Sequence, residues 1–395
     1  MISTPSTFDT KFVGIYKSAI IVQKVIPSLA LLRQKVCVKY LSSFDLCFSE
    51  KKVTSMILSP ANKLEQHINF IEDNFLLLIE RFNPSRYLKN IHMDDDVENL
   101  NANQDASKIN EIKCVLIVDF ILNLKNDSFL KKHLLSKLQK SKTPTQTLKV
   151  LKDINNIIKG CSKKRKEYYE KNYPAWLNEL PNSFKYKDVS NTYGFDIVTK
   201  FDLRFCPYCN DEPIPTIVGA NRNYRAAIDH FYPKARYPFL AVSLFNFIPA
   251  GTRCNSGFKS ESDMVGYFNP SIHRLKKEAL FNFTFSPDNK IQHDTLMVSL
   301  SKNDDLLNKN ISLFELESVY NNNECKIEIE KIHERILHHR SLGDENLDNI
   351  LLSEELIRRE FNIDLFIPAK HVRWQKYLID FLNQICNRDY TIKIL

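Results

Sequence analysis

Glycine is scarce in this chain, with 8 residues among 395. So few glycines argue against a glycine-rich β-sandwich and against a large α/β nucleotide-binding domain, which use glycine at tight turns. The sequence contains no glycine-rich phosphate-binding loop, so the chain is not expected to be an ATPase itself. It also lacks a Gly-x-Ser-x-Gly segment, which argues against the nucleophile elbow of α/β-hydrolases.

The sequence also lacks a targeting segment and a long apolar run. No basic-then-apolar leader with a small-residue cleavage site opens it. The semi-apolar stretch 19–32 is interrupted by Gln23, Lys24 and Pro27, so we do not expect it to span a membrane. Most of the nine cysteines stand alone in apolar helical surroundings, as buried free thiols do. These features predict a reduced, cytoplasmic protein with no membrane partner, in which paired cysteines indicate metal or redox chemistry rather than disulfides.

The composition is typical of a soluble globular protein, with 43% hydrophobic and 26% charged residues. A length of 395 residues is too great for one ordinary core, so two or three domains are expected. The net charge of +8 suits a polyanionic partner and permits nucleic-acid binding without proving it.

The pattern along the chain predicts a mainly α fold. Helical periodicity covers most of residues 1–92 and returns at 112–124, whereas 93–110 is rich in Asn and Asp and predicts a loop. Residues 281–285 alternate like a strand, and helical patterns return from 306 to 394. We therefore expect an N-terminal helical region over 1–183, a central motif domain over 184–285 and a C-terminal helical region over 286–395.

The central segment from Cys206 to Lys259 carries the chemistry. An Asp229-His230 pair follows an apolar residue, Asn246 precedes an apolar-Pro turn, and a Cys254-Asn255 pair opens a helix that carries Lys259. Phosphodiester hydrolysis requires a base for water and a cation on the phosphate. His230 is the candidate base, because a neutral imidazole can accept a proton near pH 7.

The same set supplies ligands for a catalytic cation. Magnesium prefers few protein oxygens and keeps its waters, so Asp229 and Asn255 suffice as ligands for Mg²⁺ or Mn²⁺. Asn246 is expected to fix the loop that orients His230. Each of these residues alone is weak evidence, and the order and framing of the whole set make it specific.

These residues resemble the HNH nucleases of the ββα-metal fold. The resemblance rests on CPYC, DHFYPK, the Asn-apolar-x-Pro segment and CN-x-x-x-K, and covers roughly residues 184–270. It is closest to the nuclease subunits of bacterial anti-phage systems such as Septu, in which an ATPase accompanies the nuclease. It implies His230 as general base, Asp229 and Asn255 as ligands of the catalytic cation, and Asn246 as the orienting residue. It also implies a central ββα-metal (HNH) core in the domain 184–285.

Such domains often carry a structural Zn²⁺ held by two Cys-x-x-Cys pairs. Cys206 and Cys209 form the first pair, but Gly251 stands three residues before Cys254, where the second pair needs a cysteine. Three thiolates therefore remain. A fourth ligand could come from His273 or His293; alternatively, no zinc binds and the cysteines only pack.

Basic side chains near the motif are candidates for phosphate contacts. They are Lys234, Arg253 and Lys259, with Lys259 favoured because it lies on the motif helix, whereas Arg236 is interpreted as ordinary surface charge. Together these features predict an endonuclease that cuts DNA, and the resemblance, with the large helical flanks, implies an ATPase as partner protein. Two alternatives stay open: an HNH nuclease that cleaves RNA or tRNA, and a non-catalytic nucleic-acid-binding scaffold.

Overall fold

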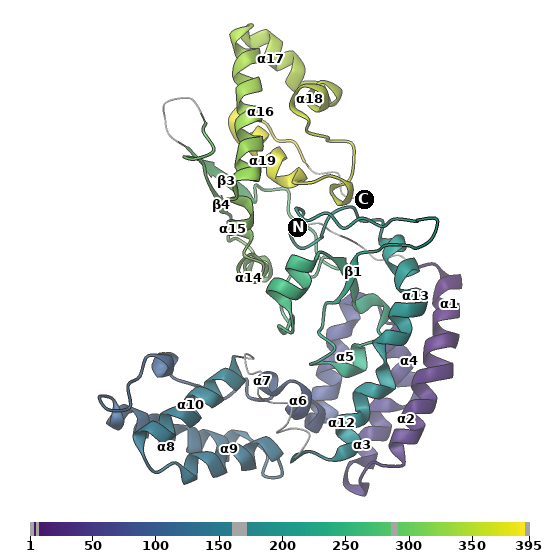
Figure 1. The fold of residues 1–395 in the computed structure, drawn as a ribbon, viewed down its shortest axis with the longest axis vertical. Helices are drawn as coiled ribbons and strands as arrows, with labels where there is room; N and C mark the ends of the chain where they lie inside the picture. The colour runs from purple at the N-terminus through teal and green to yellow at the C-terminus, as the bar shows by residue number, and fades with distance from the viewer. Residues whose placement is uncertain (1–3, 5–7, 160–171, 286–290, 392–395) are drawn as a thin grey trace.

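The computed structural model of the chain describes residues 4, 8–159, 172–285 and 291–391. Within them the fold is mainly helical, with two small antiparallel sheets of two strands each. Figure 1 shows β1 between the N-terminal helices, in purple and blue, and the C-terminal helices, in light green and yellow. The prediction of a mainly α fold is therefore confirmed.

Helices make up most of the described residues before the motif. They are α1 (Thr10–Tyr16), η1 (Lys17–Val25), α2 (Ile26–Arg33), α3 (Val38–Phe48), α4 (Glu50–Leu58), α5 (Ala61–Asn74), α6 (Leu76–Phe82), α7 (Pro84–Tyr87), η2 (Asp95–Glu98), α8 (Ala106–Asn123), α9 (Phe129–Lys140), α10 (Pro144–Ile158), α12 (Ala175–Glu179), η3 (Leu180–Phe184) and α13 (Tyr186–Phe201). Figure 1 shows α8, α9 and α10 to one side of the other N-terminal helices.

The elements α1, η1 and α2 form one continuous helix with a π-helical middle. A proline inside a helix has no N–H and crowds the carbonyl one turn earlier. Just before Pro27 the N–H of Ile26 bonds to the carbonyl of Ile21, five residues back, so the helix is widened where the proline enters. Among the described residues this helix, Thr10–Arg33, is long and apolar enough to cross a membrane by length and composition alone, and 33% of its apolar window is buried.

Helix α8 begins earlier than the sequence pattern predicts. The expected loop over 93–110 contains the short η2 and ends at Ala106, where α8 starts. The extra helical turn is explained by Ile109, which is 1% exposed and so extends the buried face one turn ahead of Ile112. The sequence pattern does not predict this turn because residues 93–110 are mostly polar and Ile109 alone extends the apolar face of α8.

The motif region folds as a β-hairpin followed by a helix. Strand β1 (Ala227–His230) pairs antiparallel with β2 (Phe247–Ala250), so that Asp229 faces Ile248 and His230 faces Phe247 in the register. Two single turns, η4 (Pro238–Leu240) and η5 (Leu244–Asn246), lie in the connection. The helix η6 (Arg253–Lys259) follows directly, as the Cys254-Asn255 pair predicts.

The second sheet joins the motif region to the C-terminal helices. Strand β3 (Phe281–Thr284) pairs antiparallel with β4 (Met297–Leu300). The alternating sequence pattern predicts β3, but no sequence pattern predicts β4. The expected domain boundary between residues 285 and 286 therefore falls between two strands of one sheet. The inward ring of Phe283 packs 5.2 Å from that of Phe381 on the last helix.

The remaining elements are helices that follow β4. They are α14 (Asp305–Leu313), α15 (Leu316–Tyr320), α16 (Asn323–Ser341), α17 (Asp344–Leu351), α18 (Glu354–Phe361), η7 (Ala369–His371) and α19 (Gln375–Cys386). Tyr320 at the end of α15 donates a hydrogen bond from its hydroxyl to the carbonyl of Cys209, at 2.6 Å. The C-terminal helices thus contact the cysteine turn directly.

The N-terminal helices contact the other half of the motif, the loop between β1 and β2. Tyr16 of α1 donates from its hydroxyl to the carbonyl of Val242 at 2.7 Å. The hydroxyl of Ser243 donates to the carbonyl of Met56 on α4, also at 2.7 Å. All these donors are buried, so each flank fixes one part of the motif by a hydrogen bond shielded from water.

Candidate functional site

A tight turn between α13 and β1 presents the first two cysteines. The amide of Asn210 donates to the carbonyl of Cys206 at 2.7 Å, and the amide of Cys206 donates to the carbonyl of Glu212 at 2.9 Å. Asn210 has a φ of 54°, in the left-handed region that asparagine tolerates better than most residues. The turn therefore brings the Cys206 and Cys209 side chains to one side of the backbone.

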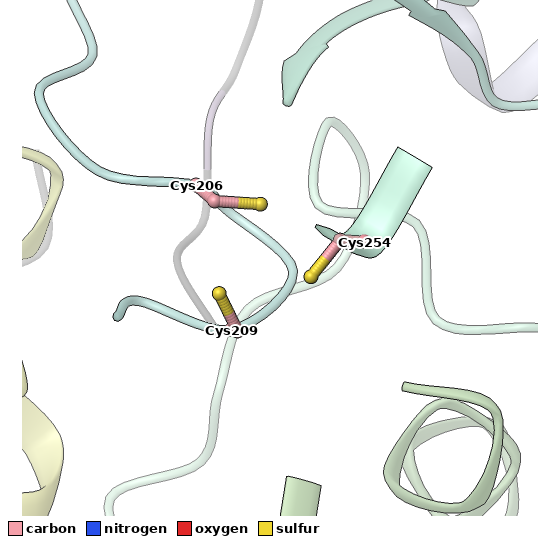
Figure 2. Close-up of side chains that lie close together, drawn as sticks. All are labelled: Cys206, Cys209 and Cys254. Carbon is pink, nitrogen blue, oxygen red and sulfur yellow. The ribbon is translucent and has the colours of Figure 1, made fainter. Parts of the chain in front are cut away.

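The sulfur atoms of Cys206, Cys209 and Cys254 lie within 4.8 Å of one another. All three residues are buried, and Figure 2 shows their side chains converging from the turn and from η6. A tetrahedral zinc ion with Zn–S bonds of about 2.3 Å places its sulfurs about 3.8 Å apart, so the spacing suits such an ion. The cluster could hold a metal such as zinc.

Hydrogen bonds concentrate on one of the three sulfurs. The pKa of Cys209 lies well below its ordinary value because the thiols of Cys206 and Cys254 donate to its sulfur. Burial raises the pKa of Cys206, and hydrogen bonds within the cluster raise the pKa of Cys254. The guanidinium of Arg253 also donates to this sulfur, at 3.5 Å. A thiolate is the form that binds metal, so the environment of Cys209 favours the ligand state.

Neither histidine proposed as a fourth ligand belongs to the cysteine cluster. His273 accepts the amide of Asn269 on its Nδ1 at 2.8 Å. His293 places its Nδ1 2.6 Å from a carboxylate oxygen of Glu330. Within the described ranges the ligand atoms that lie this close together come from the three cysteines, with no histidine among them.

Asp229 on β1 is buried and receives a hydrogen bond on each carboxylate oxygen. The hydroxyl of Tyr208 donates to Oδ2 at 2.5 Å, and Nζ of Lys259 donates to Oδ1 at 2.8 Å. Lys259 also donates to the carbonyl of His230 at 2.8 Å. The carboxylate thus joins the cysteine turn, the first strand and the motif helix.

Lys259 therefore occupies a different position from the surface site expected for a phosphate contact. Its side chain is 1% exposed and that of Asp229 is 3% exposed. An ammonium in this environment requires a partner charge, and Asp229 supplies it. In the structure the ammonium group of Lys259 therefore binds buried groups, namely Asp229 and the carbonyl of His230, and is not exposed to an incoming phosphate.

His230 ends β1 with a fixed tautomer. Its Nε2 lies 2.9 Å from the carbonyl oxygen of Ala241, and because a carbonyl can only accept, Nε2 carries the proton. Burial lowers the pKa of His230 to about 3, so the ring is neutral at pH 7 and Nδ1 has a free lone pair. The ring of Tyr186 packs edge-on against it with centroids 4.4 Å apart, and His230 is 6% exposed.

Asn246 fixes the loop between the strands. Its Oδ1 accepts the amide of Tyr232 at 2.8 Å, and its Nδ2 donates to the carbonyls of Tyr232 and Leu240 at 3.0 and 3.2 Å. The residue is fully buried, so these bonds satisfy three backbone groups that have no access to water. Leu240 immediately precedes Ala241, whose carbonyl holds His230, and the orienting role of Asn246 stays a prediction.

Asn255 lies on η6 and is partly exposed. Its amide donates to the carbonyl of Gly251, and its carbonyl accepts from Ser260, five residues on, which makes the helix π-like at this point. The side-chain carboxamide of Asn255 makes no hydrogen bond to the part of the chain that the structure describes. It is therefore available to a ligand.

The other basic candidates differ in exposure. Arg253 pairs with the buried carboxylate of Asp211 at 2.5 Å and contacts the cysteine cluster. Lys234 is exposed, with Nζ 4.7 Å from the centroid of the Tyr186 ring. Lys234 is thus the better placed of the two for an incoming anion.

Sequence reasoning missed the part played by Tyr208. Its place between the two cysteines of CPYC puts it on the turn, and a fully buried tyrosine requires a hydrogen-bond partner. A buried tyrosine in this position therefore indicates a hydrogen bond to a nearby acceptor. The sequence does not show that the acceptor is the carboxylate of Asp229.

Comparisons with known proteins give one partial similarity. The chain is 35% identical to protein ea31 of Escherichia phage lambda over 92 residues, which are 23% of this chain and 27% of that protein. The chain therefore matches about a quarter of the length of this relative. No protein-family model matches the chain, and no solved structure matches it significantly.

The buried pair of Asp229 and Lys259 yields a stability prediction. Lys259→Met should lower the free energy of unfolding by about 3 kcal/mol, because it leaves a buried carboxylate without its counter-charge. Lys63→Met is the matched control and should change it by less than about 0.5 kcal/mol, since that side chain is exposed. Urea denaturation followed by circular dichroism measures both.

A double variant separates the charge effect from lost packing. Asp229→Asn combined with Lys259→Met removes both charges and should recover part of the lost stability. Equal stability of the Lys259→Met and Lys63→Met proteins would contradict the buried pair.

Proposed function

We propose that the chain is a metal-dependent endonuclease of the HNH type that hydrolyses phosphodiester bonds in DNA. The observation that carries the proposal is the state of His230, a neutral imidazole whose Nε2 donates to the carbonyl of Ala241 and whose Nδ1 keeps its lone pair. The hairpin of β1 and β2 followed by η6 supports it, because this order is that of a ββα-metal core.

His230 acts in this proposal as the general base. Its Nδ1 takes a proton from the attacking water, and the carbonyl of Ala241 stabilises the protonated ring that results. A pKa of about 3 is low for a base at neutral pH. A substrate phosphate beside the ring raises that pKa, since negative charge favours the protonated form.

Asp229 and Asn255 would hold the catalytic Mg²⁺ or Mn²⁺. Each oxygen of Asp229 accepts one hydrogen bond and keeps a second lone pair, and the carboxamide of Asn255 is available. Two oxygen ligands suit a magnesium ion that keeps most of its waters. When bound, the cation neutralises charge on the phosphate and on the leaving oxygen. Lys259 shares Asp229 with it and balances the charge of the carboxylate.

The proposal includes a partner that activates the nuclease. His230 is 6% exposed, with the ring of Tyr186 packed against it, so a phosphate reaches the base only after a local rearrangement. An ATPase that docks on the helical flanks in the cytoplasm, as in an anti-phage defence complex, would supply such a trigger. A chain that purifies alone as a fully active nuclease would count against this regulation.

The predicted test of the base is plasmid cleavage with Mg²⁺ or Mn²⁺. His230→Ala should reduce the cleavage rate by about 10²-fold or more, because the water loses its proton acceptor. The control is His338→Ala, which alters an exposed histidine on α16 and should leave the rate unchanged. Unchanged cleavage by the His230→Ala protein would remove His230 from the mechanism.

The predicted test of the cation site uses Asn255. Asn255→Ala should raise the Mg²⁺ concentration for half-maximal cleavage by about tenfold or more, because it removes an oxygen ligand. Ser256→Ala, at the exposed neighbouring position, is the control. Identical metal dependence of the two variants would show that Asn255 is not a ligand.

The closed state of the site also favours a second candidate, a non-catalytic nucleic-acid-binding scaffold. A scaffold needs no open base, and the burial of His230 and Asp229 is then structural. Digestion of plasmid, single-stranded DNA and tRNA side by side separates the possibilities. Cleavage of tRNA alone indicates an RNA-directed enzyme, and binding without cleavage of any substrate indicates the scaffold.

A further inference from the structure

The side chain of Glu212 covers Gly251. A Cβ atom added at Gly251 would lie 2.0 Å from Oε2 of Glu212 and 2.2 Å from its Cδ. Two atoms that are not bonded cannot approach so closely, so position 251 carries no side chain while Glu212 keeps this conformation. The carboxylate thus fills the space where the side chain of a cysteine at 251 would begin.

We propose that Glu212 is the fourth ligand of a zinc ion bound by Cys206, Cys209 and Cys254. Structural zinc is almost always four-coordinate and tetrahedral, and a carboxylate oxygen is an accepted ligand at about 2.0–2.2 Å. Three sulfurs alone leave one position open. Glu212 fills the space that a cysteine side chain at position 251 would need, and its carboxylate can serve as the fourth ligand instead.

The backbone of Glu212 is already part of the cysteine turn. Its amide lies 3.5 Å from the sulfur of Cys209, and its carbonyl accepts the amide of Cys206. The carboxylate itself accepts the amide of Arg253 at 3.2 Å and is not among the ligand atoms within 4.8 Å of one another. Ligation therefore needs a rotation about the side-chain torsions of Glu212, with the backbone in place.

The surrounding charges suit this ligand set. Zinc with three thiolates and one carboxylate has a net charge of about −2, the same as a site with four thiolates. Arg253 donates to the sulfur of Cys209, and its positive charge offsets part of this excess. Arg253 thus has a place beside the metal, which differs from the phosphate contact that its sequence position indicates.

The test measures zinc affinity of the full-length protein by competition with a chromophoric chelator. Glu212→Ala and Glu212→Gln should both weaken zinc binding by about tenfold or more, since each removes the charged oxygen ligand. A purely structural glutamate gives a different result, because glutamine can still accept the amide of Arg253. Glu261→Gln, at an exposed position, is the control and should leave the affinity unchanged.

A second variant keeps the proposal testable if the single variants fold poorly. Glu212→Ala combined with Gly251→Cys creates a site with four thiolates and should restore binding. In the Co²⁺-substituted proteins the thiolate-to-metal absorption of the double variant should exceed that of the original chain by about a third, as four sulfurs replace three.

Three results would overturn the proposal. They are wild-type zinc affinity in the Glu212→Gln protein, equal cobalt absorption in the original chain and the double variant, and a purified chain that binds no zinc. None of these readouts depends on nuclease activity, so the zinc site and the proposed function are tested separately.

Discussion

The carboxylate of Asp229, held between Tyr208 and Lys259, is the interaction on which the motif depends. It connects three elements of the motif region: the cysteine turn, β1 and η6. A buried carboxylate without such partners is strongly unfavourable. The hydrogen bonds that satisfy this carboxylate therefore hold the three elements together, and they also fix the residue that would bind a cation.

The N-terminal and C-terminal helices each stabilise a different part of the motif region. The N-terminal helices bond to the loop after β1 through Tyr16 and Met56, and the C-terminal helices bond to the cysteine turn through Tyr320. A hairpin of four-residue strands has little apolar area of its own and is marginal in water. The large helical flanks thus have a structural role, because they stabilise the hairpin and the cysteine turn. This role does not depend on a partner protein.

The sequence was sufficient for features that depend on local order. It predicted the helix that begins near Cys254, the loop-fixing Asn246 and the strand at Phe281. It could not predict that Lys259 turns inward or that Glu212 covers Gly251, because both depend on which segments meet in space.

The position of Tyr208 links the two halves of the site. It lies between Cys206 and Cys209, so the turn that places two sulfurs also places the hydroxyl that donates to Asp229. A metal bound by these cysteines holds that turn rigid, and with it one of the two partners of the carboxylate. The conformation of the cysteine turn therefore affects Asp229, because Tyr208 on that turn donates a hydrogen bond to its carboxylate. This coupling gives a physical reason for a metal turn and a candidate catalytic pair to occur in one short segment.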